Sequence, residues 1–314
     1  MRGRHLLSIT DLSPREIDRL LGTALALKDA GQQQTPRRAV WLAGKTLALV
    51  FEKPSLRTRV SFHVAMKHLG GDCIYLSPPE VGLGQRESPA DVARVLSRYV
   101  DCIAARTFRQ ETVTELAEYS RVPVINALSD HEHPCQALAD LLTVREKKGG
   151  LAGVTLAFIG DGNNVANSLS MAAGMSGMHF RIASPAGYEI ANEVAEKAGR
   201  FAAESGGSFR QVMDPAEAVD GADVVYTDVW ASMGQEREAA VRKEDFSGYT
   251  VDARLMGRAR RDAIFMHDLP AHRGEEVADE VIDGPQSAAW DQAENRMHAQ
   301  KALLALVLGG DEGD

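Results

Sequence analysis

The chain has 314 residues, of which 44% are hydrophobic and 25% are charged, and its formal net charge is −9. These fractions are ordinary for a globular protein, and the length allows two domains. The negative charge argues against nucleic acid or an anionic membrane as a partner, so an anionic ligand would need locally concentrated arginines. No apolar run approaches the roughly 18 residues of a membrane span, which also argues against a membrane partner.

The first five residues lack the apolar stretch and cleavage site of a secretory signal. The three cysteines, Cys73, Cys102 and Cys135, are odd in number and widely spaced, which disfavours a disulfide framework. A reducing compartment fits this pattern, so we expect a cytoplasmic protein.

The first half of the chain alternates predicted strands with predicted helices. A capping box with Pro at the first helical position, residues 13–16, predicts a helix to about residue 28. Strands are predicted over 46–51, 72–76, 102–105 and 122–126, and helices over 60–69, 91–100, 111–119 and 136–147. The mostly apolar helix 60–69 is expected to be largely buried. Residues 77–87, rich in Pro and Gly, are expected to form a long loop.

After Gly149-Gly150 a second alternation begins. Its strands are predicted over 154–159, 179–183, 208–212, 223–227 and 263–267, its helices over 163–175, 189–204 and 215–219, and a last helix over 292–308. Such alternation predicts an α/β fold of two domains, each a parallel sheet flanked by helices. The expected division is 1–148, 149–291, and a C-terminal helix with a frayed tail over 292–314.

The stretch Phe51-Glu52-Lys53-Pro54-Ser55-Leu56-Arg57-Thr58-Arg59 joins a predicted strand to a predicted helix. Pro54 ends the strand and Ser55 can cap the helix, whose unpaired N–H groups and dipole favour an anion. Arg57 can add a bidentate fork to phosphate oxygens. There is no Gly-Lys-Ser/Thr run of a Walker A loop. The stretch predicts a phosphate-binding loop, although by itself it also fits a capped helix with two solvated arginines.

Candidate residues recur at one kind of position. Ser55, Arg106, Asn164, Asp228 and Asp268 each lie at or just beyond the carboxyl end of a predicted strand. Open α/β sheets bind ligands at that edge. Two such sheets facing each other would form an interdomain active-site cleft, and we expect the site there.

Five motifs in a fixed order resemble those of the aspartate/ornithine carbamoyltransferase family. They are the 51–59 stretch, His133-Pro134-Cys135-Gln136, Gly160-Asp161-Gly162-Asn163-Asn164, Asp228-Val229-Trp230-Ala231-Ser232-Met233-Gly234-Gln235-Glu236, and His267-Asp268-Leu269-Pro270, with Glu294-Asn295-Arg296 after them. The resemblance covers essentially the whole chain, and Ser-Met-Gly points to the ornithine branch. It implies carbamoyl transfer from carbamoyl phosphate to the δ-amine of L-ornithine, giving L-citrulline and phosphate. It also implies no metal or organic cofactor, and a homotrimer or a multiple of trimers.

The resemblance assigns roles on the donor side. His133 would hydrogen-bond the carbamoyl oxygen, Gln136 would accept from the carbamoyl NH2, and Leu269 would offer its backbone carbonyl. The last helix would pack back on the first domain. The 77–87 loop would reach a neighbouring subunit's site, with no residue assigned. The full set expected to bind carbamoyl phosphate is Ser55, Leu56, Arg57, Thr58, Arg106, His133, Gln136, Leu269 and Arg296.

On the acceptor side, the resemblance implies that Asn164 binds the head group of ornithine and Asp228 its side-chain amine. Ser232 and Met233 would lie on a loop that covers ornithine. The residues expected to act in catalysis are Arg57, Arg106, His133, Asp228 and Asp268.

One position departs from the family, because Asp268 stands where the family has Cys. With Asp228, it places two acids near one nitrogen and would hold the amine as ammonium, which has no lone pair for attack. We therefore expect a lower rate, a shifted pH optimum or a different amine.

Three alternatives remain. The chain could carbamoylate another amine, or bind carbamoyl phosphate without turnover. A nicotinamide oxidoreductase is disfavoured because Val165 stands where the third glycine of the dinucleotide fingerprint would be. A metal site at His131, His133 and Cys135 is also disfavoured, because Pro134 interrupts the spacing and no second ligand cluster follows.

Overall fold

The computed structural model describes residues 1–32, 41–231 and 236–309 and divides into two compact units. One comprises Met1–Leu142 and Glu294–Asp314, the other Thr143–Ala293. The divisions fall inside α6 (Pro134–Lys148) and α13 (Ala289–Leu304), whereas the sequence predicted them at 148/149 and 291/292. Ser232, Met233 and the predicted frayed end beyond residue 309 lie outside the described residues.

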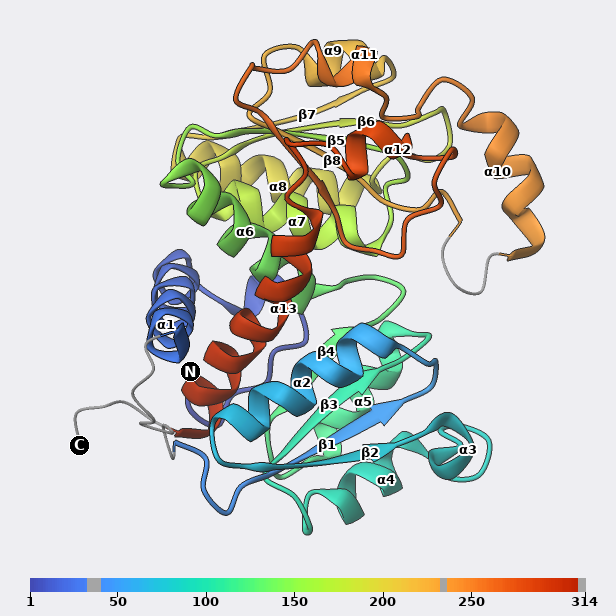
Figure 1. Cartoon of the computed structure of the whole chain (residues 1–314). Coiled ribbons are helices and arrows are strands. Elements are labelled where there is room, and N and C mark those ends of the chain that lie inside the picture. The colour runs from blue at the N-terminus through green and yellow to red at the C-terminus, as the bar shows by residue number, and fades with distance from the viewer. Residues whose placement is uncertain (33–40, 232–235, 310–314) are drawn as a thin grey trace. The chain divides into compact units, whose positions relative to one another are not determined.

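The first unit is built on a four-stranded parallel sheet in the order β2-β1-β3-β4 (Figure 1). The strands are β1 (Thr46–Phe51), β2 (Asp72–Leu76), β3 (Cys102–Arg106) and β4 (Val124–Leu128). The helices are η1 (Ile9–Asp11), α1 (Pro14–Gln32), α2 (Leu56–His68), α3 (Pro78–Val81), α4 (Pro89–Leu96) and α5 (Gln110–Tyr119). Each parallel pair needs a crossover, which α2 to α5 supply.

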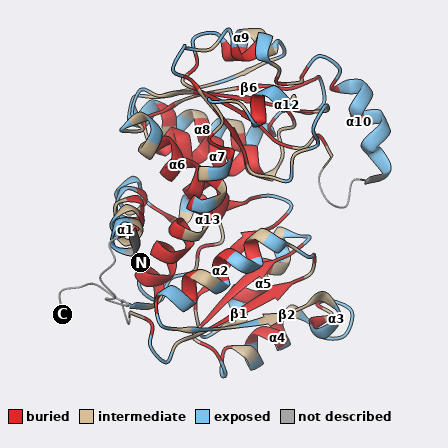
Figure 2. Cartoon of the chain, in the orientation of Figure 1, coloured by how far each residue is buried: buried red, intermediate tan, exposed pale blue. Residues whose placement is uncertain are grey.

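Both faces of this sheet are covered by helices. In β1, residues 47–51 are all buried, which explains the unbroken apolar run of its sequence (Figure 2). Ala48 and Val50 share a core cluster with Val92 of α4 and Leu116 of α5. The α2 helix lies on the opposite side of the sheet from α4 (Figure 1).

Two expectations for this unit need correction. The helix after the phosphate-binding loop begins at Leu56 and is not largely buried: Phe62, Ala65 and Met66 form a buried face, whereas Val60 is 48% exposed. The predicted loop 77–87 contains α3, a short helix whose first turn is closed by a capping box between Ser77 and Glu80. The early start of α2 and the presence of α3 arise because capping residues start a helix before any apolar periodicity is visible. The lower burial of α2 arises because a helix on one face of a sheet buries only one apolar stripe.

The second unit contains a five-stranded parallel sheet in the order β7-β6-β5-β8-β9. Its strands are β5 (Thr155–Ile159), β6 (His179–Ala183), β7 (Ser208–Val212), β8 (Val224–Thr227) and β9 (Ile264–His267). Its helices are α7 (Asn164–Met175), α8 (Asn192–Ser205), α9 (Pro215–Val219), η2 (Glu236–Glu238), α10 (Ala239–Asp245), α11 (Ala253–Met256) and α12 (Asp279–Ile282). The two helix-flanked parallel sheets confirm the predicted α/β class.

Helices also cover both faces of the second sheet. Figure 1 shows α7 and α8 on one side and α9, α11 and α12 on the other. Phe158 of β5 stacks on Tyr226 of β8 with ring centroids 5.2 Å apart, on the face opposite to Ile159 and Val225, which join the core cluster with α9 and α11. The short helices α10, α11 and α12 were not predicted, because each is too short for apolar periodicity to identify.

The strand order defines one switch point in each sheet. In the first unit the chain moves outward from β1 to β2 and then returns to β3, and in the second it moves from β5 to β7 and returns to β8. Loops at a switch point diverge to opposite sides and leave a crevice at the carboxyl ends of the strands. The 52–55 loop and Arg106 lie at the first such point, and the 160–163 loop and Asp228 at the second.

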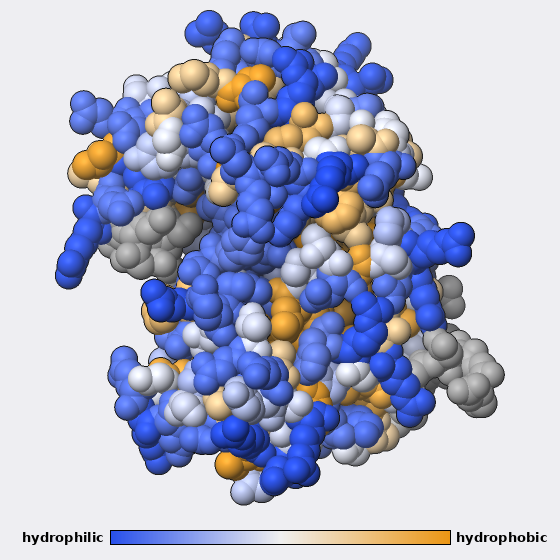
Figure 3. Space-filling view, turned by 180° about the vertical axis from the view of Figure 1, so that it is seen from behind, coloured by the Kyte–Doolittle hydropathy of each residue, from blue (hydrophilic) through white to orange (hydrophobic). Residues whose placement is uncertain are grey.

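Hydrophilic side chains cover most of the face drawn in Figure 3. Within the described residues, no helix combines the length and the apolar character that a membrane span requires.

Candidate functional site

The loop that the sequence analysis predicted to bind phosphate forms the expected capped helix start. Ser55 is the N-cap of α2: its Oγ accepts the Thr58 N–H at 3.3 Å and donates to Thr58 Oγ1 at 3.0 Å. Leu56 and Arg57 occupy the first two helical positions. Their N–H groups have no partner inside the helix, so the start of α2 can bind an anion.

Two buried arginines belong to the same unit. Arg106 is the last residue of β3, beside β1, and is 5% exposed. Arg296 of α13 is 4% exposed, and its Nη2 donates to Thr58 Oγ1 at 2.7 Å. The C-terminal helix therefore brings the Arg296 guanidinium to the start of α2.

His133 and Gln136 lie at the start of α6. Burial, followed by the positive charges of Arg296, Arg106 and Lys53, holds the pKa of His133 well below its ordinary value, so its imidazole is neutral at neutral pH. Gln136 Nε2 donates to Asp140 Oδ1 at 2.8 Å. Its buried Oε1 accepts no hydrogen bond within the part of the chain that the structure describes, so it can accept from a ligand N–H.

Lys53 is a member of this cluster that the sequence analysis did not select. Its side chain is buried, and its Nζ lies 5.0 Å from the centroid of the Phe108 ring. Burial and the charge of Arg106 lower the pKa of Lys53 to about 8, against the opposing effect of Asp130 and Glu52. The available signal was its place in the loop, two residues before Ser55. Such buried cations create a strongly positive potential for a doubly negative ligand.

Asp228 of the second unit is held by the residue that caps α7. Asn163 Oδ1 accepts the Val165 and Ala166 N–H groups at 2.9 and 3.1 Å, and Asn163 Nδ2 donates to Asp228 Oδ2 at 2.7 Å. Asn164, which the resemblance assigns to the head group of the amine substrate, is the first residue of α7. The hydrogen bond from Asn163 holds the direction of the Asp228 carboxylate.

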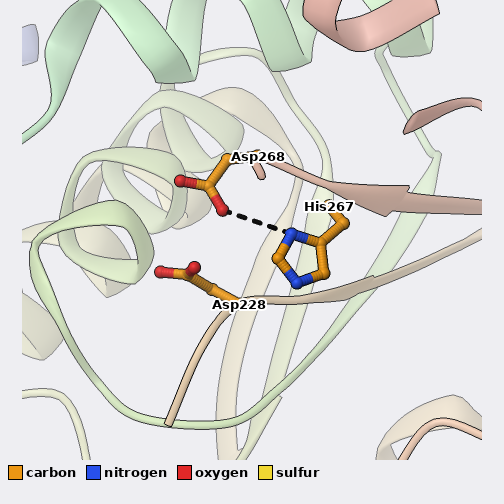
Figure 4. A group of neighbouring side chains, drawn as sticks. All are labelled: Asp228, His267 and Asp268. Carbon is orange, nitrogen blue, oxygen red and sulfur yellow. Dashed lines mark ion pairs between the residues drawn. The ribbon is translucent and has the colours of Figure 1, made fainter. Parts of the chain in front are cut away.

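Asp228, His267 and Asp268 converge at the carboxyl ends of β8 and β9 (Figure 4). One ring nitrogen of His267 and one carboxylate oxygen from each aspartate all lie within 4.8 Å of one another. This arrangement places two acids from neighbouring strands where they can share one cationic ligand. The resemblance to the family led us to expect these two acids near one nitrogen, and the structure brings them together.

The hydrogen bonds of His267 define its tautomer. Leu269 N–H donates to Nδ1 at 2.9 Å, and Nε2 lies 3.1 Å from Oε1 of the fully buried Glu276. The proton of the neutral ring therefore lies on Nε2, and Nδ1 is an acceptor. Asp268 Oδ1, 3.5 Å from Nδ1, faces an acceptor rather than a donor.

Asp228, His267 and Asp268 are also residue types that bind divalent metals. The Nδ1 lone pair that points toward the two acids already accepts the Leu269 N–H. A metal would have to displace that hydrogen bond, so we assign no metal role to this group.

Leu269 follows directly and has a left-handed backbone with φ of 62°. This region is unfavourable for a residue with a branched side chain, and such strain is concentrated at functional sites. The hydrogen bond from its N–H to His267 holds the backbone in place.

The Gly160-x-Gly162 turn has a packing explanation. A Cβ on Gly162 would lie 2.3 Å from the backbone nitrogen of Ile190, so the loop before α8 leaves no room for a side chain. The close approach of two backbone segments therefore explains the second glycine, and no dinucleotide is needed to explain it.

Comparison with known proteins relates both units to one family. Residues 4–146 match the family model described as aspartate/ornithine carbamoyltransferase, carbamoyl-P binding domain, and residues 152–307 match the model for the Asp/Orn binding domain. The chain is 55% identical to an ornithine carbamoyltransferase of Pyrococcus abyssi over 99% of this chain and 97% of that protein.

Solved structures give the same relation. The ornithine carbamoyltransferase of Pyrococcus furiosus superposes with a TM-score of 0.95 at 54% identity, covering 99% of each chain. The ornithine transcarbamoylase of Giardia lamblia superposes with a TM-score of 0.89 at 35% identity, covering 99% of this chain and all of the other. The family that the five ordered motifs resembled is thus confirmed, and this chain belongs to the aspartate/ornithine carbamoyltransferase family.

Proposed function

We propose that this enzyme, a transferase, moves the carbamoyl group of carbamoyl phosphate to the δ-amine of L-ornithine and releases L-citrulline and phosphate. The observation that carries the proposal is the chemistry of the two switch points. One bears a capped helix start with buried cations, and the other bears two acids on neighbouring strands. The first suits a phosphate and the second an ammonium group. The names of the similar proteins support the choice of ornithine.

On the donor side, Ser55, Thr58, Arg57, Arg106 and the N–H of Leu56 bind the phosphate. Arg296 positions Thr58 through their 2.7 Å hydrogen bond. Gln136 Oε1 accepts from the carbamoyl NH2, and the Leu269 carbonyl accepts a second hydrogen bond from it. Neutral His133, with Arg57 and Thr58, stabilises the negative charge that develops on the carbamoyl oxygen.

On the acceptor side, Asp228 receives the side-chain ammonium of ornithine, and Asn164 binds its head group together with Ser232 and Met233. The ammonium releases one proton to solvent as it enters the site, and the lone pair of the resulting amine attacks the carbamoyl carbon. The C–O bond to phosphate then breaks, and the departing phosphate takes up the second proton from the attacking nitrogen. Positioning and electrostatics supply the rate acceleration, and no step is assigned to a metal or an organic cofactor.

The decisive experiment is an amine-specificity assay. Citrulline-type product is measured with carbamoyl phosphate and, in turn, ornithine, putrescine, lysine and acetylornithine. We expect ornithine to give the highest kcat/KM. A higher kcat/KM with another amine would favour the alternative that Asp268 has changed the substrate, and binding of carbamoyl phosphate without product would favour a non-catalytic homologue.

Replacing Asp268 by Cys is expected to raise kcat/KM for ornithine by roughly tenfold. One of the two acids that hold the amine as ammonium is removed, so the uncharged nucleophile forms more readily. Asp268→Asn, which removes the charge without adding a thiol, should reproduce part of the gain. Unchanged or lower turnover in both variants, measured from pH 6 to 9, would contradict this account.

Carbamoyl phosphate affinity is expected to fall as pH rises through about 8, the pKa of Lys53. Below that pH the side chain is an ammonium that attracts the doubly negative phosphate, and above it the charge is lost. The total rise in Kd should approach one log unit as the charge is lost. Calorimetry between pH 7 and 9 measures it.

Lys53→Met should weaken binding roughly tenfold at pH 7 and flatten this pH dependence. Lys67→Met, at an exposed position of α2, is the matched control and should keep both the affinity and its pH dependence. If the Kd for carbamoyl phosphate still depends on pH in Lys53→Met, another group is responsible for the titration.

We further propose a cytoplasmic homotrimer, or a multiple of trimers, that associates through the first unit. Six of the nine large hydrophobic side chains exposed among the described residues lie there: Leu56, Val60, Ile74, Val95, Tyr99 and Phe108. The three cysteines are free thiols, which fits a reducing compartment. Sedimentation equilibrium should give three times the mass of the chain, or a multiple of it.

A further inference from the structure

Arg242 of α10 is a buried residue to which no role has been assigned. It is 8% exposed, and it binds three partners from separate segments. Its Nη1 donates to Asp161 Oδ2 at 2.7 Å and to the Trp230 carbonyl at 2.9 Å, and its Nε donates to Glu238 Oε2 at 3.0 Å. The Tyr188 ring lies 4.9 Å from the guanidinium carbon.

The partners of Arg242 lie beside the amine-binding acid. Asp161 precedes Asn163 by two residues in the loop after β5, and Trp230 follows Asp228 by two residues after β8. These loops meet at the switch point of the sheet, where Asn163 donates to Asp228. One guanidinium nitrogen thus binds both loops that carry the Asn163–Asp228 hydrogen bond.

Arg242 also balances a second acid in this region. Burial raises the pKa of Asp161, the charges of Asp228 and Glu238 add to that effect, and the ion pair with Arg242 opposes it. Without the guanidinium, Asp161 would either take up a proton or compete with Asp228 for a cation. With it, the pair of Asp161 and Arg242 is neutral.

We propose that Arg242 is a positioning residue of the amine site, which holds the two loops in register and neutralises Asp161, so that an incoming ammonium is directed to Asp228. The inference rests on the proposed function, because it concerns how that function's acceptor is bound. Tyr188 and Asp245, joined by a 2.7 Å hydrogen bond, support α10 on the side of the Tyr188 ring.

The test compares Arg242→Met, Arg242→Lys and Asp161→Asn in the full-length protein. Arg242→Met should raise the KM for ornithine at least tenfold, with a smaller loss of kcat, and leave the Kd for carbamoyl phosphate within twofold. Arg242→Lys should raise the KM for ornithine less than Arg242→Met does. Lys243→Met is the matched control, because this exposed neighbour pairs only with Glu275 among the contacts found in the described residues.

Asp161→Asn keeps the shape of the site and serves if Arg242→Met does not fold. It leaves only the exposed Glu238 to balance the Arg242 charge near Asp228, so it should also raise the KM for ornithine. The double variant removes both charges and should have a lower KM than the product of the single effects predicts. An unchanged KM in Asp161→Asn, or an equal weakening of both substrates, would overturn the proposal. Absence of citrulline formation by the unsubstituted protein would instead refute the proposed function.

Discussion

Replacing Arg57 by alanine is expected to weaken carbamoyl phosphate binding roughly 100-fold, about 3 kcal/mol. Arg57 occupies the second position of α2, beside the N–H groups that the Ser55 cap leaves available to a ligand. Its guanidinium can form two parallel charge-assisted hydrogen bonds to phosphate oxygens, and alanine forms none. Calorimetric titration with carbamoyl phosphate in the absence of the amine measures the change directly.

The same helix offers a matched control in Arg59. This exposed side chain lies with its guanidinium carbon 3.9 Å from the centroid of the Tyr75 ring. Arg59→Ala removes the same formal charge two residues away, so it should change the Kd by no more than about twofold. Equal weakening in both variants would mean that a diffuse positive field binds the donor, and the loop would lose its assigned role.

Replacing Asp228 by asparagine is expected to lower kcat/KM for ornithine roughly 100-fold or more. The substitution removes the charge that receives the ammonium. It also disturbs the local hydrogen bonds, because the two carboxylate oxygens accept from Asn163 Nδ2 and from the Val229 N–H, both at 2.7 Å. An amide has only one oxygen, so its NH2 would face a donor. Steady-state kinetics with varied ornithine measures the loss.

Asp262→Asn provides the control for net charge. Asp262 is exposed and precedes β9, so it lies at the edge of the same sheet opposite to Asp268. Its replacement should leave kcat/KM unchanged within twofold, and neither variant should alter carbamoyl phosphate affinity. A comparable loss in both, or a loss of donor binding in Asp228→Asn, would remove Asp228 from the amine site.

Much of the fold could be predicted because local signals agreed with the tertiary packing. The apolar run 46–51 is a buried strand, and Ser55 caps the helix after it, as its position after Pro54 indicated. The prediction for 60–69 was wrong in its burial, because a helix covering one face of a sheet needs only a single apolar stripe. Elements such as α10 were missed because a helix of seven residues has too few turns to show a period.

The candidate residues could be chosen in advance, but their partners could not. Asn164 was selected from its motif, but the motif did not indicate that Asn163, which caps α7, donates to Asp228. Lys53 was not selected, because it is burial and the neighbouring charge of Arg106 that lower its pKa. Nothing local in α10 indicated that Arg242 binds two loops far away in the sequence.

The order of amino acids alone determined the α/β alternation, the capped helix start at Ser55, the family motifs and the unusual Asp268. These properties depend on neighbours within a few residues, where side-chain pattern and backbone preference act directly. The three-dimensional structure decided that His267 lies beside the two acids, which of its nitrogens carries the proton, and how Lys53 and Arg242 are buried. Those properties depend on parallel strands that bring distant loops to one edge of a sheet, where burial and neighbouring charges determine the chemistry of each group.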